Sequence, residues 1–166
     1  GHVQRPGNYE VTMGTPMKDL IFDMCGGMKP GRKLKAVIPG GSSVPIMTAA
    51  ETEDCLLDYE GVVARGSMLG SAGMIVMDDS TDMVYQIWRL ARFYAHESCA
   101  QCTQCREGTA WTTKILERIL AGKGKASDLD LLLSLSENMT GKTICVLSDS
   151  CAAPIVSGIA KFRSEF

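Results

Sequence analysis

Apolar and polar positions divide the chain into a mixed first half and a helical second half. In the first half, two short apolar runs at residues 34–38 and 74–77 are bounded by glycine, proline or aspartate. Runs of this length with such boundaries are typical of buried strands. The stretch 44–66 between them shows no clear period, and we predict that it is irregular.

The beginning of the chain predicts a hairpin followed by a helix. A proline–glycine turn at residues 5–8 separates the extended pieces 1–4 and 9–12, because proline presets φ and glycine supplies a positive φ. Apolar residues then follow helical spacing between the capping pair Thr15-Pro16 and the terminating pair Gly26-Gly27. One helix is therefore expected to lie between these two pairs.

The second half contains four segments whose apolar residues follow helical spacing. The first is capped by Thr81-Asp82 and runs into a cysteine-rich segment. The other three follow Gly108, Ser127-Asp128 and Ser148-Asp149-Ser150. Four amphipathic helices with short loops are typical of a small four-helix bundle. We interpret their apolar stripes as core and not as cofactor sites.

Together these patterns predict an α+β chain of two domains. Strands, one helix and further strands within residues 1–80 favour a β-grasp domain made of one sheet and one helix. Residues 81–166 form the predicted all-α four-helix bundle. A length of 166 residues is sufficient for both cores. Because the sequence begins with Gly1 and not with methionine, we expect it to be a piece of a longer polypeptide.

Two glycine-rich segments could suggest a nucleotide site, but neither matches the pattern of one. Gly40-Gly41-Ser42-Ser43 lacks the Gly-Lys-Ser/Thr ending of a P-loop. Residues 66–73 precede a strand and lack the spacing of a dinucleotide-binding fingerprint. We therefore expect turns and close packing of backbone segments at both places.

Charge and composition argue against several functional classes. The net charge is −2, from 17 basic and 19 acidic residues without a basic block, which argues against binding to nucleic acid or to an anionic membrane surface. No apolar run approaches the length of a membrane span and no signal peptide is evident, so we expect no direct membrane insertion. Seven cysteines, an odd number, argue against a disulfide framework and favour a reducing compartment.

Four of the cysteines are candidates for one metal centre. Cys99, Cys102 and Cys105 are spaced at three residues, so their sulfur atoms can converge. Cys145 lies between the third and fourth predicted helices. In an up-and-down bundle, that loop and the loop after the first helix lie at the same end. We therefore expect Cys145 to lie beside the other three and to complete a four-thiolate site.

The spacing favours a [4Fe–4S] cluster at this site. Three closely spaced ligands and one distant ligand are typical of such a cluster, whereas structural zinc usually takes two C-x2-C pairs. Zinc is the main alternative, followed by a disulfide or redox switch. We expect Thr103, Arg106 or backbone amides of the segment to hydrogen-bond the sulfur atoms and to tune the potential.

The remaining candidate ligands are interpreted as non-ligands. His96 precedes the cysteine segment and is expected to pack or hydrogen-bond nearby. Cys151 lies at the start of the fourth predicted helix, where a thiolate would be favoured, but Cys145 is better placed to be the fourth ligand. Cys25 and Cys55 are expected to be small buried apolar side chains.

Several motifs resemble those of one protein family. The segments Glu97-Ser98-Cys99-x-x-Cys102-x-x-Cys105-Arg106-Glu107-Gly108-Thr109, 141–145 and 162–166 are similar to the iron–sulfur end of the flavoprotein 1 (fifty-one-kilodalton, or F) subunit of NADH:quinone oxidoreductase, respiratory complex I. Residues 5–10, 31–43 and 66–71 are similar to its β-grasp, soluble-ligand-binding (SLBB) domain. The resemblance covers essentially the whole chain.

This resemblance implies that Cys99, Cys102, Cys105 and Cys145 hold one [4Fe–4S] cluster next to a flavin. It implies the electron-transfer portion of an NADH dehydrogenase, which passes electrons from FMN to partner iron–sulfur subunits of the twenty-four-kilodalton and seventy-five-kilodalton types. In the family, the FMN and NADH loops lie on an N-terminal domain that has no counterpart in this sequence. We therefore expect this chain to be inactive with NADH by itself and to supply no catalytic acid, base or nucleophile.

The resemblance also implies a place on the cytoplasmic or mitochondrial-matrix side, peripheral to the inner membrane as part of a complex. Two alternatives stay open. One is a diaphorase subunit of an NAD-linked hydrogenase or formate dehydrogenase, which shares these motifs, and the other is a non-enzymatic, zinc-stabilised scaffold. The chain departs from the family at Ser148 and Cys151, where small alanines after Gly-Asp are usual, and this changes the packing close to Cys145.

Overall fold

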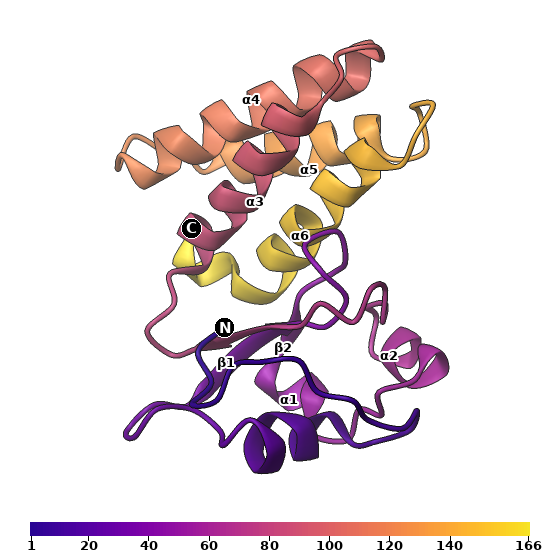
Figure 1. Ribbon diagram of the computed structural model, residues 1–166. Coiled ribbons are helices and arrows are strands. Elements are labelled where there is room, and N and C mark those ends of the chain that lie inside the picture. Colours follow the sequence, from indigo (N-terminus) through magenta and orange to yellow (C-terminus); the bar gives the residue numbers. More distant parts are fainter. The chain divides into compact units, whose positions relative to one another are not determined.

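The computed structural model describes all residues from Gly1 to Phe166. They fall into two compact units, Gly1–Thr81 and Asp82–Phe166. Strands and short helices build the first unit, and four longer helices build the second (Figure 1). The α+β class predicted from the sequence is confirmed.

A three-stranded antiparallel sheet organises the first unit. β1 (Leu34–Ile38) lies between β2 (Met47–Thr48) and β3 (Ile75–Asp78). Val37 in the central strand pairs with Met47 on one side and with Val76 on the other. Both predicted strands are therefore present, and their apolar residues form the buried centre of the sheet.

The stretch 44–66, predicted to be irregular, contains more regular structure than expected. Besides β2 it holds the short helices α1 (Ala49–Thr52) and α2 (Tyr59–Ala64). Thr48 and Glu51 form a reciprocal capping box at α1, and the Asp58 side chain caps α2. Helices this short cannot establish an apolar period, so the sequence pattern does not predict them.

The predicted N-terminal hairpin is wrong. Val3 forms an isolated bridge with Met28, and the amide of Gln4 donates to the carbonyl of Gly27 at 2.9 Å. Gly26 and Gly27 have φ values of +77° and +70°, which glycine adopts readily. This glycine pair turns the chain back, so the extended start pairs with the segment that follows the first helix.

The predicted helix before the glycine pair is present but is wound differently. It continues as the π-helix η1 (Asp19–Met24), in which the amide of Cys25 donates to the carbonyl of Leu20 at 2.9 Å. Thr15 does not cap it, because its hydroxyl donates to the carbonyl of Thr12. Ile21 is fully buried, so the predicted apolar face does pack into the core.

Two backbone segments of the first unit meet at glycine residues. A Cβ atom on Gly70 would lie 2.4 Å from the carbonyl oxygen of Gly40, and one on Gly40 would lie 2.5 Å from that of Met68. Gly70 also has a φ of +50°. The expectation that the glycine-rich segments serve close backbone packing is confirmed.

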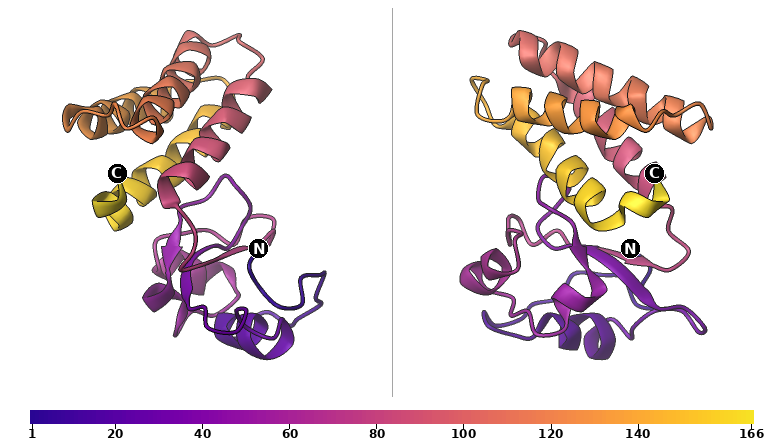
Figure 2. Two further views of the ribbon diagram at one scale, coloured as in Figure 1. Left: turned by 90° about the vertical axis from the view of Figure 1, so that its left-hand side faces the viewer. Right: turned by 180° about the vertical axis from the view of Figure 1, so that it is seen from behind.

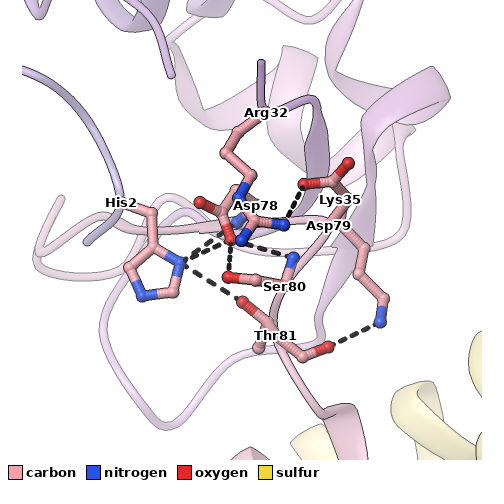
Figure 3. A network of polar contacts seen from close by, with 7 residues as sticks. All are labelled: His2, Arg32, Lys35, Asp78, Asp79, Ser80 and Thr81. Atoms are coloured by element: carbon pink, nitrogen blue, oxygen red, sulfur yellow. Dashed lines mark hydrogen bonds and ion pairs between the residues drawn. The ribbon is translucent and has the colours of Figure 1, made fainter. Parts of the chain in front are cut away.

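A polar network closes the end of β3 (Figure 3). Asp78, only 3% exposed, accepts hydrogen bonds from the hydroxyl and the amide of Ser80 at 2.6 and 3.0 Å, and lies 2.9 Å from Nδ1 of His2. These hydrogen bonds, those of Ser80 foremost, lower the pKa of Asp78. Lys35 Nζ donates to the carbonyl of Thr81 at 2.6 Å, so the network anchors the start and the end of this unit.

Four helices form the second unit, followed by the short 3-10 helix η2 (Arg163–Glu165): α3 (Met83–Glu97), α4 (Thr103–Leu120), α5 (Ser127–Met139) and α6 (Leu147–Phe162). Each packs on its neighbours in the order α3, α4, α5, α6, and α6 returns to pack on α3. Figure 2 shows the α4–α5 pair crossing the α3–α6 pair. None of the helices has the length and apolar character needed to cross a membrane.

The ends of these helices differ in part from the prediction. Asp82 caps α3 as expected, because its side chain accepts from the amide of Tyr85. α4 starts earlier than predicted, at Thr103, so that Cys105 lies in its first turn. α6 starts at Leu147, so the expected cap 148–150 lies inside the first turn instead of before it.

Candidate metal centre

The two cysteine-bearing segments lie at the same end of the second unit. Cys99 and Cys102 lie between α3 and α4, Cys105 lies in the first turn of α4, and Cys145 lies between α5 and α6. The amide of Ile144 donates to Sγ of Cys102 at 3.5 Å. Both connections lie side by side in Figure 1 and Figure 2. The bundle topology thus brings the Cys145 loop to the other cysteines.

We call residues 98–106 and 141–146 together the cysteine tip. Its four thiols span the range from core to surface. Cys105 is 7% exposed, Cys102 is half-buried, and Cys99 and Cys145 are exposed. One side of the tip is therefore backed by the helical core, and the other side reaches the surface.

The first segment of the tip is held by an arginine. Ala100 has a φ of +62°, a left-handed conformation that costs a residue with a side chain about 1–2 kcal/mol. Arg106 Nη1 donates to the carbonyl of Ala100 at 2.8 Å, and Arg106 Nε donates to Glu107 at 2.9 Å. The expectation that Arg106 hydrogen-bonds a sulfur atom is wrong, because its guanidinium fixes the turn instead. Thr103 is exposed and makes no hydrogen bond to a sulfur atom.

Two other groups do contact candidate ligand sulfurs. One is the amide of Ile144, which donates to Cys102 from the second segment and not from the first, where a backbone donor was expected. The other is the hydroxyl of Ser98, whose Oγ lies 3.3 Å from Sγ of Cys105. The sequence indicated no role for Ser98. Ser98 directly precedes Cys99 in the sequence, but the direction of its hydroxyl depends on the turn at Ala100.

Hydroxyl groups support the loop that carries Cys145. Thr143 Oγ1 donates to the carbonyl of Cys145 at 2.8 Å and lies 2.6 Å from Oγ of Ser148. Ser148 is fully buried and donates to the carbonyl of Met139 at 3.3 Å. The Ser148 hydroxyl therefore forms a polar link between α5, α6 and the Cys145 loop.

The three other cysteines are buried. Cys25 and Cys55 are 8% and 1% exposed in the first unit, which confirms their interpretation as small buried side chains. Cys151 is fully buried in α6, and burial, together with the nearby Cys105, raises the pKa of its thiol to about 12. The expected thiolate-favouring helix start is wrong for Cys151, because α6 begins at Leu147 and leaves Cys151 beyond the first turn.

His96 lies in the last turn of α3 with an exposed side chain. It makes no hydrogen bond to the cysteine tip, and the expectation that it packs nearby stays a prediction. The helix ends directly after it, and the chain turns toward the cysteines only from Ser98 onward.

The donor set of the tip consists of four thiols, which suit a soft metal or an iron–sulfur cluster. A zinc ion would require its sulfur ligands at about 2.3 Å from one point, whereas a cubane distributes its thiolates over separate iron atoms. Four thiols, with hydrogen-bond donors at Cys102 and Cys105, are the type of ligands that iron–sulfur clusters use.

Comparison with known families assigns each unit. Residues 1–85 match the SLBB domain, which is slightly more than half of the chain. The chain belongs to the SLBB-domain family. After this SLBB unit, residues 85–166 match the NADH-ubiquinone oxidoreductase-F iron-sulfur binding region.

Individual relatives match along the whole chain. The F subunit of the NADH-quinone oxidoreductase of Rickettsia bellii is 48% identical over 99% of this chain, and that of Streptomyces coelicolor is 49% identical over 100% of it. The chain spans only 40% and 36% of these relatives. The resemblance to the F subunit that the motifs indicated is confirmed.

One similar solved structure is an NAD+-reducing [NiFe]-hydrogenase in the air-oxidised state. Its match has a TM-score of 0.86 and 31% identity, and covers 99% of this chain and 28% of the hydrogenase chain. The fold of the SLBB unit and the helical unit therefore also occurs in a hydrogenase of this type.

Proposed function

We propose that this chain is the electron-transfer portion of an NADH dehydrogenase flavoprotein subunit, in which Cys99, Cys102, Cys105 and Cys145 hold one [4Fe–4S] cluster. The observation that supports this most directly is the contact between Cys102 and the amide of Ile144, which brings the Cys145 loop to the other three thiols. The iron–sulfur region matched by residues 85–166 supports the same proposal. When bound, such a cluster takes up and releases electrons.

The residues of the tip would fix the position and the potential of that cluster. Cys105 is backed by the helical core and keeps water from one side, while the Ile144 amide and the Ser98 hydroxyl offer hydrogen bonds to sulfur. No acid, base or nucleophile is required from this chain, because electron transfer needs only a fixed place and a tuned potential.

The surface around Cys145 favours coverage by other protein. Ile144 is 86% exposed and Val146 is 73% exposed, so two apolar side chains flank this thiol on the outside. Apolar side chains grouped at one place on a surface favour contact with another protein surface. We propose that electrons arrive from FMN on a further domain that also binds NADH, and leave to partner iron–sulfur subunits of the twenty-four-kilodalton and seventy-five-kilodalton types. The place of the assembly would be peripheral to the inner membrane, on its cytoplasmic or matrix side.

A second candidate is the diaphorase part of an NAD-linked hydrogenase. The similarity to the NAD+-reducing [NiFe]-hydrogenase favours it, although at 31% identity against 48% for the F subunit of Rickettsia bellii. Purification from the native source with its bound subunits separates the two. Quinone-reductase subunits would support the first proposal, and hydrogenase subunits would support the second.

The cluster itself is tested by purification without oxygen. We expect a brown protein that contains iron and acid-labile sulfide in equal amounts and gives an electron paramagnetic resonance (EPR) signal on reduction. A colourless protein with one zinc ion and no sulfide would contradict the proposal and support the zinc-stabilised scaffold.

NADH oxidation with an artificial electron acceptor tests whether the FMN and NADH sites lie outside residues 1–166. Residues 1–166 alone, loaded with the cluster and supplied with FMN, should show no NADH oxidation above background. The full-length protein is the positive control, and activity in residues 1–166 alone would show that the flavin and nicotinamide sites lie here.

A further inference from the structure

Ser98 connects the end of α3 to the buried ligand of the tip. Its Oγ lies 3.3 Å from Sγ of Cys105 and also accepts a hydrogen bond from the amide of Ala100 at 3.3 Å. The residue is half-buried and occupies the C-cap of α3, with φ −63° and ψ 123°. This extended conformation carries the hydroxyl away from the helix and toward α4.

The two contacts decide the direction of the hydrogen bond. The Ala100 amide can only donate, so the Ser98 oxygen is the acceptor in that contact. The hydroxyl hydrogen is left for the second contact, and a metal-bound thiolate can only accept. Ser98 therefore donates to Cys105 whenever Cys105 is a thiolate.

We propose that Ser98 is a positioning residue that raises the reduction potential of the cluster through this hydrogen bond; the inference rests on the proposed function. An added electron makes the cluster and its thiolates more negative, and hydrogen bonds to more negatively charged acceptors are stronger. A donor on Cys105 thus stabilises the reduced form more than the oxidised form. The hydroxyl is also a group that a substitution can remove, unlike the amide of Ile144.

The turn at Ala100 makes this arrangement specific. Arg106 holds the carbonyl of Ala100 at 2.8 Å, which keeps the Ala100 amide directed at Ser98. Ser98 is thereby oriented by a group that does not itself reach a sulfur atom. Removal of the hydroxyl should change the potential, while the arginine clamp on Ala100 persists.

The test compares Ser98→Val with Ser98→Thr in the full-length protein, because these two side chains have similar shapes and differ in the hydroxyl. Iron and sulfide are measured first, and the midpoint potential is then measured by redox titration followed by EPR. We expect Ser98→Thr to keep the wild-type potential. We expect Ser98→Val to shift the ratio of reduced to oxidised cluster at a fixed potential roughly three- to tenfold toward the oxidised form, which is roughly 30 to 60 mV lower for one electron.

Each outcome decides one of the two proposals. An unchanged potential in Ser98→Val with full iron content overturns the role of Ser98 and leaves the proposed function intact. Loss of iron from Ser98→Val but not from Ser98→Thr would support a role for the hydroxyl at Cys105. Loss of iron from both variants would overturn the role of the hydroxyl and indicate that Ser98 only packs. Wild-type protein without iron or sulfide overturns the proposed function itself.

Discussion

The SLBB unit and the helical unit differ in where their cysteines lie. Cys25 and Cys55 of the SLBB unit are buried among apolar side chains, where a thiol packs as a small apolar group. Cys99 and Cys145 of the helical unit are exposed, in segments held by polar contacts. Exposure alone does not separate the two kinds, because the candidate ligand Cys105 is 7% exposed and Cys25 is 8% exposed. The candidate ligands instead share one end of the helical unit.

Each unit has one alanine in the left-handed conformation, Ala72 at φ +55° and Ala100 at φ +62°, and the units differ in the contacts around their turns. In the SLBB unit, Gly70 has a positive φ and lies directly against Gly40, so the close approach is made possible by the absence of side chains. In the helical unit, Ala100 has a positive φ despite its side chain and is held there by Arg106. The hydrogen bond from Arg106 to the carbonyl of Ala100 is thus one of the contacts that fix the shape of the cysteine tip.

The largest expected effect tests the contrast between exposed and buried thiols. Cys145→Ser should lose the cluster, because a hydroxyl is a poor substitute for a thiolate ligand. Cys151→Ala should keep the full iron content, because that thiol is fully buried inside α6, whereas the loop that carries Cys145 contacts Cys102 through Ile144. Iron and sulfide analysis after anaerobic purification measures both.

The same two variants also show whether Cys151, and not Cys145, is the fourth ligand. A complete cluster in Cys145→Ser together with its loss in Cys151→Ala would move the ligand from the α5–α6 connection into α6. Cys55→Ala is the matched control from the SLBB unit and should retain all iron.

The second prediction tests the backbone contact of the SLBB unit. Gly70→Ala should lower the unfolding free energy of this unit by about 2 to 5 kcal/mol, because the new Cβ atom would meet the carbonyl of Gly40 in a left-handed conformation. Gly66→Ala is the control, since Gly66 has a φ of +73° but nothing within 4 Å of an added Cβ atom. It should cost only about 1 kcal/mol. Hydrogen exchange of peptides from β1 and β3 measures both, and equal costs would contradict the close contact.

The comparison of the units also shows what the sequence could predict. Long apolar periods predicted all four helices, and short runs predicted β1 and β3, because burial of one face or of a whole strand leaves a periodic signal. The motif spacing indicated that Cys99, Cys102 and Cys105 could meet, and the bundle topology indicated that Cys145 lies at the same end. These features depend on local sequence or on simple connectivity.

Other features depend on contacts between distant residues. The bridge from Val3 to Met28 replaced the expected hairpin because the glycine pair reverses the chain, and a local pattern favoured the nearer partner. The turn at Ala100 determines that Ser98 reaches Cys105 while Arg106 does not. No single residue in the sequence encodes that outcome, so the sulfur contacts of the tip could not be assigned in advance.

The third prediction tests the polar support of the Cys145 loop. Thr143→Val removes the hydrogen bond to the carbonyl of Cys145 and the contact with the buried Ser148 hydroxyl. Because loss of a group that orients a metal ligand typically weakens metal binding at least tenfold, we expect roughly tenfold faster loss of iron to a chelator. Thr143→Ser keeps the hydroxyl and should behave like wild type. Equal rates in the two variants would show that the loop does not need this support.

The smallest expected effect concerns two neighbouring carboxylates of the SLBB unit (Figure 3). Asp78 is buried with its pKa lowered, mainly by Ser80, whereas Asp79 has a side chain that is 43% exposed and faces Arg32 at 3.7 Å. Asp78→Asn should lower the unfolding free energy at pH 7 by about 1 kcal/mol, because hydrogen bonds to a charged acceptor are stronger. Asp79→Asn, which loses only a surface ion pair, should change it little.

The pH dependence of the unfolding free energy tests whether the Asp78 carboxylate stabilises the fold in its charged form. A lowered pKa means that the Asp78 carboxylate stabilises the fold above its unfolded pKa of about 3.9, and that this contribution is lost as the pH falls through the lower folded value. The difference between wild type and Asp78→Asn should therefore be complete at pH 7 and should shrink below about pH 4. Hydrogen exchange of β3 peptides, corrected for the intrinsic effect of pH, measures this difference. A difference that stays constant down to pH 3 would mean that the charge of Asp78 contributes nothing and that its burial alone fixes the end of β3.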